Sequence, residues 1–453
     1  MRQLLDKLHA RLGDFWWYSL MLFCACRAAD LLNAFVGLWL VPKYVDPSEL
    51  GAVMPLTQFA NFLAIPVAAF ANTFRNELTR LSINKEFGKL KTLMRGVFAA
   101  TAVFLFVAIV VARFLLPAFL ERIRIVEGSL GLVIIAASFV GAVAPIYSNA
   151  LQALKKFKAQ SLLSIVGAPV RLIAMLLAMP FRAITGYFVG QAAVPAFNIA
   201  ASVVALRKEL AVKAEPYWTN EVIRRFAKLF TIFLITGGIG GFFLLVEATV
   251  LRQRLPDLDS AGYYMATRFS EIATFLLATI AFTIFPFTAE IAAKGGDSRP
   301  LIIKSLMANL VFCLTLALPF IFFGKTILSL LPNGDKYATY SWAIPWLIGL
   351  SFITSIVGLY TTAEFSANRF RFLIWYMPID IAYPLLLLFV TGHNYFTGYI
   401  PTSWTEFLST HNIYSLETML IWISSFNGIK AVGCLIAMIF NSNSKIHLQP
   451  APA

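Results

Sequence analysis

The chain has 453 residues, of which 59% are hydrophobic and only 13% are charged, and its mean hydropathy is +0.75. Soluble domains are about 45–50% apolar and about 25% charged, so this composition excludes an ordinary soluble protein. The net charge of +14 does not indicate nucleic-acid binding, because short basic loops beside anionic lipid explain an excess of Lys and Arg in a membrane protein.

Apolar runs of about 20 residues recur along the chain, and each can cross a bilayer core of roughly 30 Å. These runs lack the alternation of β-barrel strands, so we expect an all-α polytopic membrane protein with about 12 transmembrane helices. Residues 1–15 place basic residues between apolar ones at helical spacing and predict an interfacial helix. The predicted spans are 16–42, 50–76, 94–119, 128–152, 160–179, 184–206, 229–251, 261–290, 303–331, 341–366, 372–392 and 418–440.

The distribution of basic residues predicts the orientation of these spans. An even number of spans puts both termini on one side. With that side inside, about 24 of the 37 Lys and Arg residues fall in inner segments and about 8 in outer loops. This roughly threefold bias predicts cytoplasmic termini, including a cytoplasmic tail at 441–453. We interpret the basic inner loops as topology signals in contact with lipid headgroups, with docking of a partner protein as the alternative.

A polar segment near the middle divides the chain. Residues 207–228 are predicted to be a cytoplasmic linker between an N-lobe, 16–206, and a C-lobe, 229–440. The halves share a faint parallel repeat at an offset of about 210 residues, which predicts two six-helix lobes facing a central cavity and alternating access by rocking of the lobes. In this repeat an Asp, a Gly and a Met recur: Asp46, Gly51 and Met54 correspond to Asp257, Gly262 and Met265.

Neither the cysteines nor the histidines indicate a metal or catalytic site. All four histidines fall outside the spans and form no cluster, and the sequence has no Walker A, H-E-x-x-H or G-x-S-x-G motif. We therefore expect no metal, no cofactor, no enzymatic activity and no ATP-driven pump within the chain. The cysteines all lie in apolar spans, which predicts buried, inert thiols: Cys24, Cys26, Cys313 and Cys434.

Charged residues inside the spans are the main functional candidates, because an arginine at the centre of a bilayer costs at least roughly 2.5–3.5 kcal/mol on insertion scales. One interpretation is an ion pair or a snorkelling side chain that fixes packing. The other is a hydrated cavity that binds an anion, for which the planar fork of arginine suits phosphate. Arginines in both halves favour the second. The residues concerned are Arg27, Asp30, Arg171, Glu247, Arg268, Glu271, Asp380 and Lys430, with Arg75 at the inner end of the second span.

Two roles are predicted for these charges. Arg27, Arg171 and Arg268 are predicted to neutralise an anionic substrate, and four acids are candidates for a coupling ion, a proton or sodium. Arg27 with Asp30, and Arg268 with Glu271, are also spaced to pair within one helix. The coupling candidates are Asp30, Glu247, Glu271 and Asp380.

The stretch Ala261 to Glu271, AGYYMATRFSE, resembles an eighth-span signature of the MATE-like (MOP) superfamily of flippases, in particular its polysaccharide-biosynthesis branch. The resemblance covers roughly residues 20–390, and the order and spacing of its motifs make the set specific. The outer loop 393–417 departs from the family pattern, in which a short glycine-rich turn is usual. Further matches are Pro286 with Glu290, Leu50-Gly51, Phe74 to Glu77, Ala150 to Lys158, Arg171, and Ala367 to Arg371.

The resemblance implies a flippase that moves an undecaprenyl-diphosphate-linked oligosaccharide from the cytoplasmic to the periplasmic leaflet of the bacterial inner membrane, for polysaccharide or lipopolysaccharide export. It implies that Arg268 faces the cavity and contacts the diphosphate, and that Arg75 recruits the headgroup at the inner mouth. Implied partners are the lipid-linked glycan, membrane lipids, and a polysaccharide polymerase or glycosyltransferases. Lipid II members often carry two further spans, so twelve spans favour the oligosaccharide branch.

Three alternatives remain open at this point. A MATE-type ion-coupled drug or cation antiporter predicts a cavity dominated by acids, against which the mid-span arginines argue. A membrane glycosyltransferase or polymerase predicts long outer loops with clustered Arg, His or acids, and only 393–417 is long here. The third alternative is a scaffold for a biosynthetic complex that does not itself transport.

Overall fold

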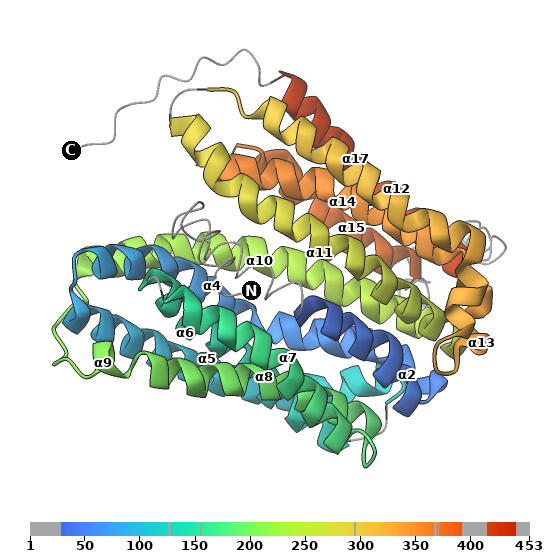
Figure 1. Ribbon diagram of the computed structural model, residues 1–453, viewed down its shortest axis with the longest axis horizontal. Coiled ribbons are helices and arrows are strands. Elements are labelled where there is room, and N and C mark those ends of the chain that lie inside the picture. Colours follow the sequence, from blue (N-terminus) through green and yellow to red (C-terminus); the bar gives the residue numbers. More distant parts are fainter. Residues whose placement is uncertain are drawn as a thin grey trace, which may run out of the picture. The chain divides into compact units, whose positions relative to one another are not determined.

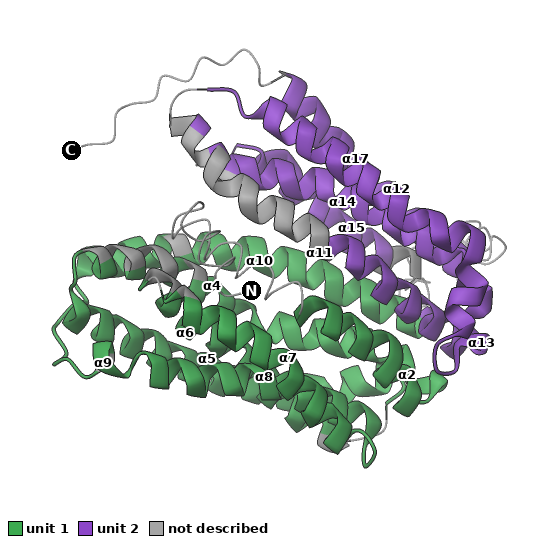
Figure 2. Ribbon diagram, viewed as in Figure 1, with its two compact units in different colours: residues 1–253 green, residues 254–453 purple. Residues whose placement is uncertain are grey.

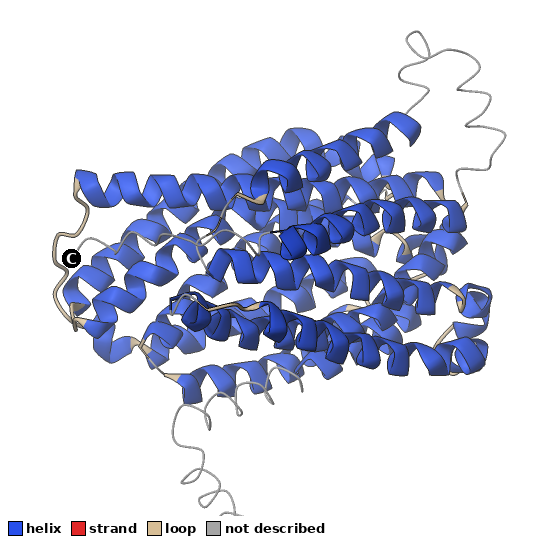
Figure 3. Ribbon diagram, turned by 90° about the horizontal axis from the view of Figure 1, so that it is seen from above, coloured by secondary structure: helices blue, strands red, loops and turns tan. Residues whose placement is uncertain are grey.

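The computed structural model describes residues 29–125, 128–154, 156–293, 296–366, 369, 371–391 and 415–440. Within these residues every regular element is a helix (Figures 1 and 3), which confirms the predicted all-α class. The predicted interfacial helix 1–15, the outer loop 393–417 up to residue 414 and the tail 441–453 lie outside the described residues.

The chain divides into two compact units, residues 1–253 and 254–453 (Figure 2). Helix α10 therefore belongs to unit 1 up to Gln253. Unit 1 begins with a helical segment at 29–35 and then contains η1 (Val36–Leu40), α2 (Val41–Tyr44), α3 (Pro47–Leu50), α4 (Val53–Ile83), α5 (Phe87–Arg122), α6 (Gly128–Ala153), α7 (Phe157–Ala178), α8 (Ala183–Ala205), α9 (Arg207–Leu210) and α10 (Asn220–Arg254). Unit 2 contains α11 (Asp257–Ala293), α12 (Arg299–Ser329), α13 (Gly334–Tyr337), η2 (Ala338–Tyr340), α14 (Ala343–Ser366), α15 (Leu373–Thr391) and α17 (Leu416–Phe440).

The helices have the length and composition of membrane spans. Among the described residues, nine helices are long and apolar enough to cross a bilayer, and α15 contributes a shorter apolar stretch at Leu373–Leu387. Helix α5, one of the nine, has 36 residues, so at 1.5 Å per residue it is about 54 Å long and exceeds a hydrocarbon core of roughly 30 Å. The protein is thus a multi-pass membrane protein.

Corresponding helices pack in the same order within each unit. In unit 1, α4 packs on α6, and α6 packs on α8. In unit 2, α11 packs on α14, and α14 packs on α17. These are the second, fourth and sixth predicted spans of each half, so the packing within each unit supports the parallel repeat that the sequence predicts.

Each unit has an apolar core at the helix ends that the predicted topology places on the cytoplasmic side. The core of unit 1 joins the end of α4, with Phe74 and Leu78, to the start of α5, with Leu90. That of unit 2 joins the end of α14, with Tyr360, to the end of α17. Water is present at this level to drive apolar burial, whereas lipid tails in the bilayer give no such driving force between helices.

The segment predicted as a linker is held against unit 1 by polar contacts. Lys91 Nζ donates to the carbonyl of Val212 (2.9 Å), and Thr92 Oγ1 donates to that of Glu215 (2.5 Å). Lys156 Nζ lies 2.8 Å from Glu209 Oε2. Burial raises the pKa of the Glu209 carboxyl, but the hydrogen bond and charge of Lys156 outweigh it, so the pKa lies below its ordinary value. Residues 207–215 are therefore an integral part of unit 1.

Gly186→Ala is expected to destabilise the protein by about 1–3 kcal/mol, because a Cβ at this position would lie 2.4 Å from the backbone nitrogen of Met179, which cannot move away as a side chain can. The measurement is the thermal unfolding midpoint of the detergent-solubilised protein. Gly141→Ala is the matched control, since its Cβ would meet nothing within 4 Å and alanine is the better helix former. Equal midpoints for the two variants would contradict the close approach of α7 and α8.

Candidate functional site

Arg268 lies inside α11, about 16 Å from the start of the helix at 1.5 Å per residue. Its Nη1 is 2.8 Å from Glu271 Oε2, and the side chains are 16% and 33% exposed, so the predicted pair within the helix is confirmed. The guanidinium also lies over the ring of Tyr264, 4.7 Å from its centroid. A carboxylate and an aromatic face thus hold one fixed cation deep in the helix.

The turns of α11 before Arg268 form a rigid platform. Tyr264 is only 1% exposed, and α11 packs along α14. A Cβ at Gly262 would lie 2.4 Å from the ring of Tyr340, so the glycine of the motif leaves room for that ring. The Tyr340 hydroxyl donates to Asp259 Oδ1 at 2.5 Å, and burial followed by this hydrogen bond raises the pKa of Tyr340 above its ordinary value. The tyrosine therefore remains a donor near neutral pH and fixes the start of α11.

Arg171 is a mid-helix cation in unit 1. It lies in α7, seven residues or about 10 Å before the helix end. Its Nη1 donates to Asn33 Oδ1 at 2.7 Å, which joins α7 to the first helical segment. Asp30 lies three residues before Asn33 and therefore on the same face of that segment. A guanidinium, an amide and a carboxyl residue are thus presented by two neighbouring helices.

Asn198 was not identified from the sequence and adds a polar group beside α7. A Cβ built at Gly167, one helical turn before Arg171, would lie 3.8 Å from Asn198 Oδ1. This oxygen is buried and has no hydrogen-bond partner among the described residues. Asparagine and glutamine residues commonly support helix packing in apolar spans. The sequence spacing therefore does not distinguish Asn198 from other amide residues that only pack.

Asp380 and Lys430 form an ion pair buried in unit 2. Lys430 Nζ in α17 lies 2.8 Å from Asp380 Oδ1 in α15, and the two residues are 6% and 8% exposed. Nζ also lies 5.7 Å from the ring centroid of Tyr376. The ammonium therefore occupies the position beside Asp380 that a coupling cation would take. The sequence predicts that both charged residues lie within spans, but it does not indicate that they form an ion pair.

The structure describes only some of the remaining residues that were predicted to have a functional role. Glu247 is 6% exposed in α10 of unit 1. Arg75 belongs to α4, but its side chain is not among those described, and Arg27 lies outside the described residues. The structure therefore brings Arg171 together with Asn33, and Arg268 together with Glu271, while the contacts predicted for Arg27 and Arg75 stay predictions. Among the described residues no group of three or more His, Cys, Asp or Glu could hold a metal ion.

Arg252 is a buried cation that the sequence did not distinguish from other outer-loop charges. It is 2% exposed, and it donates to the carbonyl oxygens of Ile123 (3.2 Å) and Ser48 (2.7 Å). These bonds connect the end of α10 to the end of α5 and to α3. Both hydrogen bonds go to backbone carbonyls of unit 1, so Arg252 contributes to the architecture of that unit.

The fold is similar to several solved structures of transporters. An inward-facing multidrug resistance MATE family transporter of the MOP superfamily aligns at a TM-score of 0.65 and 10% identity, over 92% of this chain and 93% of its own. The lipid II flippase MurJ in an inward closed conformation aligns at 0.63 and 13%, over 94% and 87%. A MOP superfamily transporter from Pyrococcus furiosus, described as having a binding pocket of reverse polarity, aligns at 0.63 and 11%, over 93% and 94%.

These alignments cover both units and show that the chain has a MATE-like fold, which is the fold that its motifs predict. No protein-family model matches the sequence, and no curated protein matches it. At such identities the similarity is one of fold, so the chemistry of transport must be argued from the residues themselves.

Proposed function

We propose that this protein is a flippase that moves an undecaprenyl-diphosphate-linked oligosaccharide from the cytoplasmic to the periplasmic leaflet, by alternating access and without catalysing a reaction. The observation that carries the proposal is Arg268, a fixed guanidinium about 16 Å inside α11. The fold supports it, since a lipid II flippase has the same architecture. The carrier lipid of such a substrate is joined to its glycan by a diphosphate, which is the anion that a guanidinium binds best.

The contacts of Arg268 suit exchange with a phosphate. Its partner carboxylate, Glu271, is the more exposed member of the pair, at 33% against 16%. Glu271 therefore holds the guanidinium in place between transport cycles and can give way to a phosphate oxygen, with Tyr264 beneath the guanidinium throughout. In unit 1, Arg171 with its neighbour Asn33 supplies a second cation for the anionic substrate.

The wider proposal follows the predicted topology. The protein lies in the bacterial inner membrane with both termini in the cytoplasm, and it exports material for polysaccharide or lipopolysaccharide synthesis. A polymerase or glycosyltransferases that make and consume the lipid-linked glycan are its partners. A proton or a sodium ion acting at Asp30, Glu247, Glu271 or Asp380 couples transport to an ion gradient.

A cation antiporter is the second candidate, because a multidrug MATE transporter shares the fold and because Glu247 and Asp380 are buried acids. The Asp380 carboxylate is already neutralised by Lys430, which weakens this candidate. The Pyrococcus furiosus neighbour is described as differing in function through the polarity of its pocket. The sign of the charge that meets the substrate therefore separates the two functions.

The test uses the purified protein in lipid vesicles. A fluorescent oligosaccharide linked through a diphosphate to a polyprenol is expected to become accessible on the far leaflet, whereas the same oligosaccharide on an uncharged polyprenol ether is expected to stay in place. A labelled organic cation is tested in parallel under proton and sodium gradients. Movement of the cation without movement of the diphosphate-linked glycan would overturn the flippase assignment and support the antiporter.

A further inference from the structure

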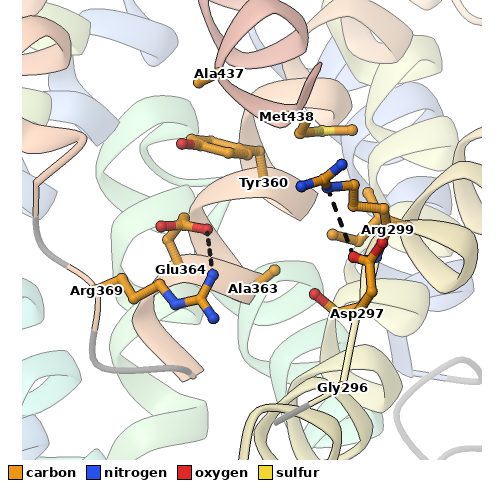
Figure 4. A pocket seen from close by; sticks show the side chains of 11 residues that line it. Gly296, Asp297, Arg299, Tyr360, Ala363, Glu364, Arg369, Ala437 and Met438 are labelled. Atoms are coloured by element: carbon orange, nitrogen blue, oxygen red, sulfur yellow. Dashed lines mark hydrogen bonds and ion pairs between the residues drawn. The ribbon is translucent and has the colours of Figure 1, made fainter. Parts of the chain in front are cut away.

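Unit 2 contains a pocket away from Arg268, at the end where α12 begins and where α14 and α17 finish (Figure 4). Its polar wall consists of Asp297, Arg299, Tyr360, Glu364 and Arg369. The predicted topology places this end of unit 2 on the cytoplasmic side, at the level where the spans leave the membrane.

The charges of the pocket form two loose pairs. Arg369 Nη1 is 4.0 Å from Glu364 Oε1, and Arg299 Nε is 3.6 Å from Asp297 Oδ1. Figure 4 shows one pair on each side of the pocket. Direct charge-assisted hydrogen bonds between such groups have N–O distances of about 2.7–2.9 Å, so the N–O distances of both pairs are too long for a strong hydrogen bond. The four groups have a net charge of zero. Asp297 Oδ1 also accepts a hydrogen bond from the backbone N–H of Arg299 (3.0 Å), so part of its acceptor capacity is already used. Glu364, Arg299 and Arg369 can each form a shorter side-chain bond to a ligand than they form within the pairs.

Part of the pocket lining is apolar and continuous with the core of unit 2. Met438 and Ala437 of α17 line it beside Ile302 of α12. Met438, Ile302 and Tyr360 also belong to the buried cluster of this unit. A ligand at this site therefore meets opposite charges at the pocket walls and apolar side chains next to them, which is the environment of a lipid headgroup at the membrane surface.

We propose that this pocket binds a phosphoethanolamine group, in which the phosphate contacts Arg299 and Arg369 and the ammonium contacts Glu364 and Asp297. A simple anion would face two carboxylates, and a simple cation would face two guanidiniums. A zwitterion of net charge zero complements both signs. The ammonium has three N–H donors, which the trimethylated nitrogen of phosphocholine lacks. A phospholipid of the inner leaflet presents this group at the height of the pocket.

The experiment measures lipid binding to the purified full-length protein by native mass spectrometry, with phosphatidylethanolamine, phosphatidylcholine and phosphatidylglycerol of identical acyl chains. Phosphatidylethanolamine is expected to bind at least about tenfold more tightly than either of the others. Soluble glycerophosphoethanolamine is expected to displace it, since the headgroup carries the recognition. Equal affinity for phosphatidylcholine, tighter binding of phosphatidylglycerol, or failure of displacement would overturn the proposal.

Glu364→Gln removes the acceptor charge for the ammonium at nearly constant volume and is expected to abolish the preference for ethanolamine over choline. Arg369→Gln is expected to weaken the binding of both zwitterionic lipids, because it removes a phosphate contact. Glu221→Gln, at an exposed position in the first turn of α10, is the matched control and is expected to change nothing. A preference for phosphatidylethanolamine that survives in Glu364→Gln would refute the site. If that variant fails to fold, the comparison of lipids with the unmodified protein still decides.

Discussion

Replacing Arg268 with alanine is expected to reduce transport of a diphosphate-linked glycan by at least about a hundredfold, while the protein stays folded in the membrane. A guanidinium can make two parallel charge-assisted hydrogen bonds to a phosphate, and each contributes about 1.5–3 kcal/mol. Loss of about 2.8 kcal/mol corresponds to a hundredfold change. The measurements are surface polymer in cells, glycan movement in vesicles, and the amount of protein in the membrane fraction.

Two control variants separate substrate binding from structure. Arg113→Ala makes the same change at an exposed arginine of α5 and is expected to transport normally. The double variant Arg268→Ala/Glu271→Ala removes both members of the pair, so it leaves no buried charge without a partner. If Arg268 only neutralises Glu271, and the coupling ion acts at another acid, this double variant recovers transport. Such recovery, or normal transport in Arg268→Ala alone, would show that the arginine has no direct role with the substrate.

Local rules of the helix explain what could be predicted from the sequence. The predicted spans 128–152 and 184–206 correspond to α6 (Gly128–Ala153) and α8 (Ala183–Ala205), because an uninterrupted apolar run of this length has few stable alternatives in a bilayer. Arg268 and Glu271 meet because positions three apart share one face of a helix. Both predictions depend only on neighbours in the sequence.

Hydropathy underestimates helices that continue beyond the bilayer. Helix α5 spans Phe87–Arg122, whereas the apolar run predicts 94–119. Its first turns contain Lys89 and Lys91, which a hydropathy criterion assigns to a loop. Lys91 is held by the carbonyl of Val212, and Thr92 is held by that of Glu215. The helix extends into water where residues 207–215 of the predicted linker pack on it, a contact that no single window of sequence contains.

Contacts between distant helices could not be predicted in the same way. Asp380 and Lys430 are 50 residues apart, and Arg171 and Asn33 are 138 apart. The sequence shows that each charge lies within a span and therefore needs a partner, but not which helices are neighbours. The packing of α15 on α17 decides that Lys430 is the partner of Asp380. This changes the interpretation of Asp380 from an isolated acid to half of a neutral pair.

Separating this pair is expected to destabilise the protein strongly. Asp380→Asn leaves a buried ammonium, and Lys430→Met leaves a buried carboxylate, in an environment where the side chains are only 8–11% exposed. Each change is expected to lower the stability by about 3–5 kcal/mol, whereas the double variant Asp380→Asn/Lys430→Met, which contains neither charge, is expected to be close to the unmodified protein. Thermal unfolding of all four proteins in detergent gives the coupling energy directly.

The pair between Lys89 and Glu86 is the matched control, because its N–O distance is also 2.8 Å but its side chains are 39% and 29% exposed. Glu86→Gln is expected to change the stability by less than about 1 kcal/mol, since water screens both charges. Equal effects at the two pairs would contradict burial as the cause.

The double variant at Asp380 and Lys430 also tests coupling, because it is expected to fold without an ionisable group at either position. If Asp380 carries the coupling ion, this variant transports independently of proton and sodium gradients. Retained gradient dependence would instead place the coupling ion at Asp30, Glu247 or Glu271.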